Sequence, residues 1–307
     1  MALKKASYIW MNRKFVKWDD AKIHILTHTL HYGTGIFEGI RCYNTIMGPA
    51  VFRLKDHMKR LENSARLIGI DMPYSASELV RATKELVKKN KLREGYIRPI
   101  VYYGYGKMGL DPRGAPVEVA IAMWPWGKYL GEESIAKGVR CKISKWRRID
   151  PRTLPTAAKV CGHYINSMLA HNDAANDKYD EAILLNTKNY LAEGPGENIF
   201  IVKNKILLTP PLSAGILPGI TRKSVIQIAR DEKIRAKEIN ISKRMLYSAD
   251  EAFFTGTAAE ITPISEIDGK KIGTGKRGPI TERIQKIFFD IVKGKNKRYL
   301  SWLDFVY

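Results

Sequence analysis

The sequence predicts a two-domain protein of the α/β class, with an α+β arrangement of helices and strands. Segments that alternate apolar and polar residues, as strands do, are interspersed with segments whose apolar residues recur every three or four positions, as in helices. The 307 residues suffice for two domains that each bury a core. A stretch rich in glycine and charge lies near mid-chain. We therefore expect a smaller N-terminal α+β domain at 1–124, an interdomain loop at 125–136 and a larger domain at 137–307.

The N-terminal block should begin with a hairpin and continue with two helices and two long strands. "YIWMNRKFV" predicts a hairpin that turns at Asn12–Arg13, and "PAVFRL" (49–54) predicts a strand. The helix after it has apolar residues at helical spacing, namely Met58, Leu61, Ala65 and Ile68. A second helix should begin near Ser77, an N-cap candidate. "YIRPIVYYGYG" (96–106) and "VEVAIAMW" (117–124) predict strands.

The C-terminal block predicts a mixture of strands, hairpins and helices. "VRCKISKW" is a strand, and "HYINSMLAHNDAAND" is a helix expected to bury Ile165, Met168 and Leu169. Two hairpins should follow, with turns near Lys188–Asn189 and Asn204. "GITRKSVIQIARDE" predicts a helix, and "EAFFTGTAAEITPI" predicts strands interrupted by a Gly-Thr turn. "GPITERIQKIFFDIVKG" predicts an amphipathic helix near the end of the chain.

The chain is strongly basic, with a net charge of +21 from 52 Lys and Arg against 31 Asp and Glu. The basic residues form short separate clusters, for example at 88–93, 270–277 and 293–298. Such clusters are typical of solvated helix ends and turns, whereas a nucleic-acid surface needs a continuous stripe. A basic nucleic-acid-binding protein is therefore only the alternative from another class. A general attraction for anionic metabolites is expected.

The cysteine pattern and the hydropathy favour a cytoplasmic protein. Cys42, Cys141 and Cys161 are far apart and form no CxxC pair, which favours free thiols over a disulfide or a metal site. No apolar run has the length needed to span a bilayer, and no apolar stretch follows the first charges as in a secretory signal. We expect no membrane partner.

Two patterns imitate functional motifs without the context that such motifs need. "GYGKMG" (104–109) matches GxGxxG, but it leads into "LDPRGAP" and cannot open the helix of a dinucleotide site. His24, His28 and His31 would share one face of a helix, yet no carboxylate or cysteine completes a metal-ligand set. Packed or hydrogen-bonded histidines account for them better, and no metal is expected.

Two signals for chemistry lie around Lys159 and Glu193. Small and apolar residues surround Lys159 in "TAAKVCG", so its amine is a candidate for a desolvated nucleophile that forms a Schiff base with an aldehyde cofactor. The alternative is a lysine whose stem packs and whose head reaches water. In "EGPGEN", Glu193 and Glu197 flank a Gly-Pro-Gly turn after a strand, and a buried carboxylate there needs a cationic or proton-bearing partner. The alternative is an exposed turn.

Two further signals suit an anion. In "LPGITR", the amides of Ile220 and Thr221 open a helix, where a phosphate is favoured by the helix dipole and by unpaired N–H groups. An ordinary helix start is the alternative. "FFTGTAAE" (253–260) offers small residues and two hydroxyls in a turn as a second set of amides. Each signal alone is weak, but all four occur in one chain.

In this order, the four signals resemble the class-IV, fold-type-IV pyridoxal-phosphate aminotransferases, and within them the branched-chain amino-acid aminotransferases. The resemblance extends over almost the whole chain. It includes "HYGTGIFEGIRCY" (31–43), "FRLKDHMKRL" (52–61), "YIRPIVYYG" (96–104), "PTAAKVCGHY" (155–164), "EGPGENIF" (193–200), "LLTPP" (207–211), "LPGITR" (217–222) and "TGTAAEITP" (255–263). It implies a two-domain enzyme with pyridoxal 5'-phosphate in the interdomain cleft.

The resemblance assigns the cofactor-binding residues. Lys159 is implied as the catalytic residue, which forms the imine with the cofactor and then acts as acid and base in the proton shift. Glu193 should keep the pyridine nitrogen protonated, so that the ring accepts electrons. Tyr164 should bind the ring hydroxylate, and Arg60 should clamp the phosphate bidentately. The remaining cofactor-binding residues implied are Leu217, Gly219, Ile220, Thr221, Gly256 and Thr257.

The resemblance also implies the reaction and its substrates. The amino group of L-leucine, L-isoleucine or L-valine passes to 2-oxoglutarate in a ping-pong reaction that gives branched 2-oxo acids and L-glutamate. An apolar pocket is implied for the branched side chains, with Arg98 at its edge to meet the glutamate side-chain carboxylate. Tyr96 and the amides of Thr257 and Ala258 should hold the α-carboxylate. The other substrate-binding residues implied are Tyr32, Phe37, Gly39, Met108, Leu110, Trp126 and Tyr129.

The family's sites are built from two subunits, with Tyr32 and Leu110 reaching in from the neighbour, so a homodimer is implied and a hexamer is compatible. One departure from the family pattern is Pro195, where a small residue is usual. Proline removes an amide donor and fixes φ, so we expect a stiffer turn beside Glu193. Two alternatives of the same fold are a D-amino-acid aminotransferase and an aminodeoxychorismate lyase. "YIRP" and the match at 31–43 count against both.

Overall fold

The computed structural model describes residues 3–126 and 134–307, and the chain divides into two compact units. The first unit consists of Met1–Gly127, Ala158–His163 and Ile291–Tyr307, and the second of Lys128–Ala157 and Tyr164–Asp290. The predicted two-domain α+β fold is confirmed. Two segments that the sequence division assigned to the second domain, the six residues around Lys159 and the C-terminal segment, belong to the first unit.

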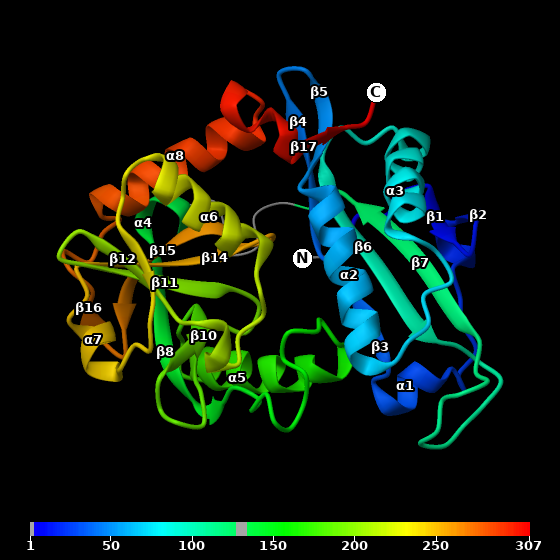
Figure 1. The fold of residues 1–307 in the computed structure, drawn as a ribbon, viewed down its shortest axis with the longest axis horizontal. Helices are drawn as coiled ribbons and strands as arrows, with labels where there is room; N and C mark the ends of the chain where they lie inside the picture. The colour runs from blue at the N-terminus through cyan, green and yellow to red at the C-terminus, as the bar shows by residue number, and fades with distance from the viewer. Residues whose placement is uncertain (1–2, 127–133) are drawn as a thin grey trace. The chain divides into compact units, whose positions relative to one another are not determined.

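The first unit is built on an antiparallel sheet. Within the described residues this sheet has eight strands in the order β17-β5-β4-β6-β7-β1-β2, with β3 paired to β6 (Figure 1). Its C-terminal strand pairs with β5, which explains why the end of the chain belongs to this unit. The bounds are β1 Tyr8–Met11, β2 Lys14–Lys17, β3 Gly35–Phe37, β4 Ile40–Thr45, β5 Gly48–Phe52, β6 Gly95–Tyr103, β7 Val117–Trp124 and β17 Leu303–Phe305.

The local predictions for this unit are confirmed with one shift. Asn12 and Arg13 have positive φ values of 45° and 67°, the conformation of a tight hairpin turn between β1 and β2. The helix predicted after β5 is α2, Leu54–Ile68, and it buries Met58, Leu61 and Ala65 completely. The next helix, α3, spans Ala76–Asn90.

The N-cap of α3 is Ser75 and not Ser77 as predicted. Ser75 accepts a hydrogen bond from the amide of Glu78, whose carboxylate in turn accepts one from the Ser75 amide. This reciprocal capping box needs Glu or Gln three residues after the cap, a condition that Ser75 meets and Ser77 does not. The remaining helical segments of the unit are α1 His28–Tyr32, η1 Trp18–Asp20, η2 Cys161–His163 and η4 Lys297–Trp302.

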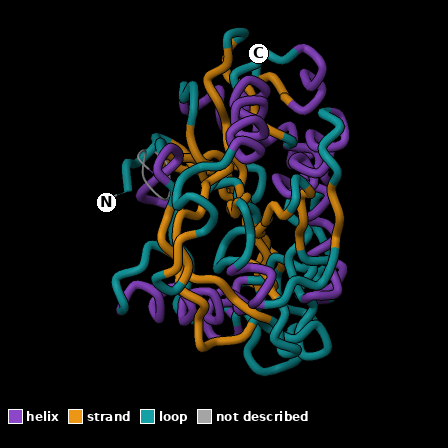
Figure 2. Tube along the Cα trace, turned by 90° about the vertical axis from the view of Figure 1, so that its left-hand side faces the viewer, coloured by secondary structure: helices purple, strands orange, loops and turns teal. Residues whose placement is uncertain are grey.

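The second unit is built on a larger mixed sheet, and Figure 2 distinguishes its strands from its helices by colour. Within the described residues the order is β10-β9-β8-β15-β14-β11-β12-β13, with β16 paired to β15. A further pairing of β10 with β11 closes six of these strands into a ring. The bounds are β8 Val139–Arg147, β9 Glu181–Leu185, β10 Leu191–Glu193, β11 Asn198–Lys203, β12 Ile206–Thr209, β13 Ala236–Glu238, β14 Glu251–Gly256, β15 Glu260–Ile267 and β16 Lys270–Lys271.

The helices of the second unit lie around this sheet, with α5 against β8 and β9 and α6 against β14 (Figure 1). The predicted inward residues of α5 are wrong for Ile165 and Met168, while Leu169 is half-buried. Ile165 and Met168 are 59% and 50% exposed, whereas Ser167, Ala170 and Ala174 face the sheet, because small residues let the helix approach β8 and β9 closely. The bounds are α4 Ser134–Lys137, α5 Tyr164–Asn176, η3 Leu212–Ala214, α6 Ile220–Asp231, α7 Lys243–Tyr247 and α8 Pro279–Val292.

Buried polar side chains in this unit also have structural duties. The carboxylate of Glu251 accepts hydrogen bonds from the amides of Ile280 and Thr281 and from the Thr281 hydroxyl at 2.7–3.0 Å, and so caps the first turn of α8.

Among the described residues, no helix combines the length and the apolar character needed to cross a lipid bilayer.

Candidate active site

Lys159 lies in the first unit, beside strand β3. Its neighbour Val160 pairs with Ile36, and the Lys159 carbonyl accepts a hydrogen bond from the Phe37 amide at 3.0 Å. The Lys159 amide donates to the hydroxyl of the fully buried Ser64 on α2 at 3.0 Å. Its Nζ lies 4.9 Å from the centroid of the Phe37 ring. The backbone on both sides of the side chain is thus fixed, which places the amine over an aromatic face.

Two glycines allow this segment to lie against β3. Gly33 has a φ of +65°, and a Cβ there would lie 2.9 Å from Cα of Gly162. The Gly162 amide donates to the Gly33 carbonyl at 3.2 Å. Because any side chain at Gly33 would push the segments apart, the glycine in "HYG" is needed for the position of Lys159.

Arg60 is held by a buried acid that the sequence analysis did not single out. Its Nε and Nη2 atoms donate to the two carboxylate oxygens of Glu38 at 2.6 and 2.8 Å. The second Glu38 oxygen also contacts Nδ1 of His57 at 2.7 Å. Glu38 is completely buried and His57 is 2% exposed. The predicted phosphate clamp is therefore part of an Arg60–Glu38–His57 network.

The charges in this network shift the pKa values of its members. Burial by itself would raise the pKa of the Glu38 carboxyl. The charges of Arg60 and His57 and the hydrogen bonds from both residues lower this pKa far below its ordinary value. Burial lowers the pKa of His57, and Arg60 and Lys159 add to this, against the opposing influence of Glu38. His57 therefore holds a proton less readily than an ordinary histidine, and Arg60 forms the ion pair with Glu38.

Arg98 lies in an aromatic cage of the first unit. Its Cζ is 4.6, 5.4 and 5.9 Å from the ring centroids of Phe37, Tyr96 and Trp124, respectively. The Nε atom of Arg98 is buried and has no hydrogen-bond partner among the described residues. Since a buried donor without a partner is costly, this atom is available for a ligand.

Further predicted substrate residues complete this wall. The ring of Trp126 meets that of Tyr96 edge-on with the centroids 4.5 Å apart. A Cβ on Gly39 would lie 2.0 Å from the Tyr96 hydroxyl oxygen, so only glycine leaves room for this tyrosine. Tyr129 lies outside the described residues.

In the second unit, Glu193 lies where β10 and β11 close the ring, as the partner of Asn198 in the pairing. Its carboxylate accepts hydrogen bonds from Asn198 Nδ2 at 2.9 Å and from the Leu217 amide at 3.1 Å. Arg148 Nε lies 2.7 Å from Oε1. The exposed-turn alternative for Glu193 is wrong, because its side chain is 6% exposed. Pro195 sits half-exposed in the intervening bend and does not prevent these contacts.

Predicted anion-binding residues also lie in this unit. Gly219 is the N-cap of α6, and a Cβ there would lie 1.8 Å from the Asn198 amide oxygen. Ile220 and Thr221 form the first turn and are 7% and 4% exposed. Residues 256–258, at the end of β14 and in the turn that follows, are half-buried. Tyr164 opens α5 and is half-buried too.

Tyr32, Met108 and Leu110 lie apart from the aromatic cage, on a surface of the first unit that we name the α1 surface. The segment 104–110 is tied to α1, since the His28 ring contacts the Gly109 carbonyl at 2.8 Å and the Gly109 amide donates to the Tyr32 hydroxyl at 3.2 Å. The α1 surface consists of the exposed apolar residues Ile25, Leu26, Leu30, Tyr32, Met108 and Leu110.

The histidines near α1 are hydrogen-bonded, as expected. His28 contacts the Thr34 hydroxyl at 2.7 Å, and His31 contacts the Ile25 carbonyl at 3.0 Å. His24 lies before the five-residue helix and accepts a hydrogen bond from the Leu26 amide at 3.1 Å. The three side chains therefore do not share one helix face.

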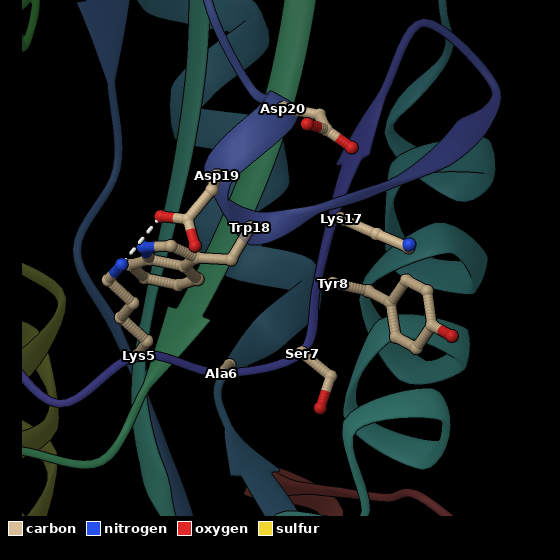
Figure 3. Close-up of a pocket in the computed structure, with 8 residues that line it drawn as sticks. All are labelled: Lys5, Ala6, Ser7, Tyr8, Lys17, Trp18, Asp19 and Asp20. Atoms are coloured by element: carbon tan, nitrogen blue, oxygen red, sulfur yellow. Dashed lines mark hydrogen bonds and ion pairs between the residues drawn. The ribbon is translucent and has the colours of Figure 1, made fainter.

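A pocket of about 360 Å³ lies elsewhere on the first unit, between the N-terminal segment and the end of β2 (Figure 3). An exposed ion pair, Lys5–Asp19 at 2.6 Å, lies at its side. None of the predicted site residues lines it, and its acidic and basic side chains face solvent. We assign it no part in the chemistry.

The side chains of the two units fit the cofactor that the resemblance implies. Pyridoxal phosphate needs a lysine, an anion for its ring nitrogen and donors for its phosphate. The chain supplies a positioned lysine, a buried carboxylate and a helix start whose glycine cap leaves no room for a side chain. Sequence motifs identified Lys159, Glu193 and Arg60. Glu38 and Arg148 were missed, because each pairs with a residue 22 or 45 positions away and no local pattern shows it.

The amino-transferase class IV family model matches residues 35–267. The branched-chain-amino-acid aminotransferase of Escherichia coli (strain K12) is 45% identical over 305 residues, which cover 99% of both chains. A crystal structure of an E. coli branched-chain amino acid aminotransferase superposes with a TM-score of 0.97 at 45% identity, covering 99% of this chain and 100% of the other.

Two further structures are similar and contain ligands. The branched-chain aminotransferase from Thermoproteus uzoniensis with norvaline has a TM-score of 0.94 at 48% identity and covers 98% of this chain and 100% of the other. The branched-chain amino acid aminotransferase of T.th., in complex with N-(5'-phosphopyridoxyl)-L-glutamate, has a TM-score of 0.95 at 43% identity, with 99% and 100% covered. From its site chemistry, its sequence and its fold, this chain belongs to the class IV aminotransferases, pyridoxal-phosphate enzymes, and within them to the branched-chain amino-acid aminotransferases.

Proposed function

We propose that this chain transfers the amino group of L-leucine, L-isoleucine or L-valine to 2-oxoglutarate. Bound pyridoxal phosphate supplies an electron sink that stabilises negative charge at the amino-acid Cα and stores the amine between the two half-reactions. The observation that carries the proposal is the Arg98 cage. It combines an aromatic wall with a buried guanidinium nitrogen that has no partner in the described chain.

The cage suits two kinds of substrate side chain. Phe37, Tyr96 and Trp126 offer apolar surface for a branched aliphatic group. Arg98 offers a charge-assisted donor for the second carboxylate of glutamate or 2-oxoglutarate. We propose that Tyr96 and the amides of Thr257 and Ala258 hold the α-carboxylate. Relatives of this chain have been seen with both norvaline and a glutamate adduct, which supports a dual pocket.

For the cofactor we propose the following residues, each described within its own unit. Lys159 would hold it covalently, and its amine would then take the proton from Cα of the amino acid and return it. Glu193 faces the ring nitrogen, and Tyr164 donates to the ring hydroxyl oxygen. Arg60 holds the phosphate. The amides or hydroxyls of Ile220, Thr221 and Thr257 also bind it. Leu217, Gly219 and Gly256 are the remaining cofactor-binding residues that we propose.

We further propose a homodimer, with a hexamer as a possible higher assembly, formed through the α1 surface. Leu110 is 90% and Ile25 is 72% exposed, and six apolar side chains gather there. Such a patch is typical of a protein interface. Replacing Leu110 by Asp should lower the sedimentation coefficient and the activity together, whereas Leu3→Asp should change neither. A Leu110→Asp protein of unchanged size would contradict this interface.

The function is tested by borohydride reduction of the loaded protein followed by peptide mapping, with amine transfer assayed on the same sample. We expect the label on Lys159 and activity with L-leucine, L-isoleucine and L-valine. Activity only with D-alanine, or only with aminodeoxychorismate, would replace the proposal by one of the two alternative activities. A colourless protein that binds unrelated DNA in a salt-sensitive way would contradict it altogether.

The three free thiols suit the cytoplasm that we propose as its location.

A further inference from the structure

Arg148 is a buried cation that the reaction as described so far does not use. It follows directly after β8, is 7% exposed, and lies in the basic segment "WRRIDPR" that looks like surface charge in the sequence. Its amide donates to the Leu185 carbonyl at 2.8 Å, and its Nε donates to the Gly215 carbonyl at 3.2 Å. The backbone and the side chain are both fixed, and Nε lies 2.7 Å from Oε1 of Glu193 as an ion pair.

The neighbouring Arg147 does not share the contact of Arg148 with Glu193. Arg147 donates from Nε and Nη2 to the amide oxygen of Asn189 at 3.3 and 3.0 Å. It contacts no carboxylate in the described ion pairs. The two adjacent arginines at the end of β8 therefore make different contacts, and of the two only Arg148 forms an ion pair with the Glu193 carboxylate.

The side chains of Arg148 and Glu193 form a buried ion pair. The two side chains are 8% and 6% exposed, so solvent screens their interaction little. A guanidinium stays charged at every relevant pH, and it favours the ionised form of a carboxylate beside it. A proton shared between that carboxylate and a facing ring nitrogen is therefore displaced toward the nitrogen.

We propose that Arg148 is a positioning residue for Glu193, which keeps the carboxylate ionised and oriented so that the proton facing it stays on the cofactor ring nitrogen. This inference rests on the proposed role of Glu193 in the transaminase reaction. Asn198 and the Leu217 amide orient the same carboxylate, but both are neutral donors. Only Arg148 supplies a charge there among the ion pairs described.

The test compares Arg148→Met and Arg148→Lys with Arg147→Met as the matched control and Glu193→Gln as the reference. Two quantities are measured without any substrate: the affinity of the apoprotein for pyridoxal phosphate, and the pH at which the absorbance of the bound cofactor changes. We expect Arg148→Met to weaken binding about tenfold or more and to move the absorbance transition in the direction given by Glu193→Gln. Arg148→Lys should keep the charge but lose the fork, and give an intermediate shift.

The outcomes separate this inference from the proposed function. If a folded Arg148→Met protein kept the wild-type affinity and transition while Glu193→Gln changed both, the inference would be overturned and the proposed function would stand. If Glu193→Gln changed neither, the role of Glu193 itself would be wrong. Circular dichroism checks folding. Should Arg148→Met fail to fold, Arg148→Lys and Arg148→Gln decide, because unchanged affinity and absorbance in both would overturn the inference too.

Discussion

Each unit of the chain contains an ion pair between a residue proposed for cofactor binding and a buried side chain of opposite charge. The proposed cofactor-binding residue is the cation in the first unit and the anion in the second. In the first unit the cation Arg60, which we propose as the phosphate ligand, is paired with the acid Glu38. In the second unit the acid Glu193, which we propose as the partner of the ring nitrogen, is paired with the cation Arg148. Because a phosphate needs a cation and a protonated ring nitrogen needs an anion, the supporting charge has to differ in sign.

The two pairs also differ in geometry and in their surroundings. Arg60 binds both oxygens of Glu38 through two nitrogens, whereas Arg148 reaches Glu193 through Nε. His57 adds a third member to the first network. The second pair instead uses the neutral donors Asn198 and Leu217. The Glu38 carboxylate is therefore held by two side chains, one of them bidentate, whereas the Glu193 carboxylate is held by one cation, one side-chain amide and one backbone amide.

The largest effect should come from removing the acid of the first pair. Glu38→Gln leaves Arg60, whose side chain is 10% exposed, without its counter-charge, and breaking such a pair typically costs about 3–5 kcal/mol of unfolding free energy. Urea unfolding of the apoprotein measures this loss. Glu94→Gln, at an exposed position, should stay within about 0.5 kcal/mol of the wild type. Equal losses in the two variants would mean that the Arg60 network is not needed for stability.

A smaller effect should distinguish the two pairs by double-mutant cycles. Contacting charged residues show coupling energies of about 0.5–3 kcal/mol. We expect a larger value for Glu38→Gln with Arg60→Met than for Glu193→Gln with Arg148→Met, because the first contact is bidentate. Unfolding free energies of the four single and two double variants supply both values. A larger coupling in the second unit would reverse the comparison.

The two units should also differ in how a histidine–glutamate pair responds to pH. His57 contacts Glu38 at 2.7 Å and His171 contacts Glu181 at 2.8 Å. Burial lowers the pKa of His57 from its ordinary 6.5, whereas the hydrogen bond to Glu181 raises the pKa of the more exposed His171. Similar contacts thus lead to opposite shifts, because only the first pair is completely buried beside further cations.

The signs of these shifts predict opposite changes on mutation. Unfolded His57 binds a proton below about pH 6.5 that the folded form does not, so this residue lowers stability on acidification. His57→Gln should therefore flatten the loss of stability between pH 6.5 and pH 5. Folded His171 holds its proton more tightly, so its contribution is present below 6.5 and lost as pH rises. His171→Gln should steepen the acid loss. Denaturant titrations at several pH values test both signs.

The smallest effect concerns the turn between Glu193 and Asn198. Proline restricts the unfolded chain, so Pro195→Ala should lower the unfolding free energy by about 0.4–1 kcal/mol. The contacts of Glu193 come from side chains and the Leu217 amide rather than from Pro195, so cofactor affinity should not change. A fall in affinity would show that the stiff turn, and not Arg148 with Asn198, positions the carboxylate.

Local patterns in the sequence were reliable where the physics is local. The Asn12–Arg13 turn, the apolar face of α2 and the glycine before α6 depend on residues within a few positions of one another, and the structure has them as predicted. The buried face of α5 was predicted wrongly. Helical periodicity marks Ile165 and Met168 as apolar, but it cannot show which side of the helix meets a sheet.

Sequence by itself determined the family and the cofactor, because the motifs that resemble the family occur in order over almost the whole chain. Tertiary structure alone decided which charges support them. Folding brings Glu38 within 3 Å of Arg60 and Arg148 within 3 Å of Glu193, although each pair is far apart in the sequence. Burial then strengthens both ion pairs, because solvent screens their charges less than at the surface. The Arg98 cage arises in the same way, since its rings come from three different strands.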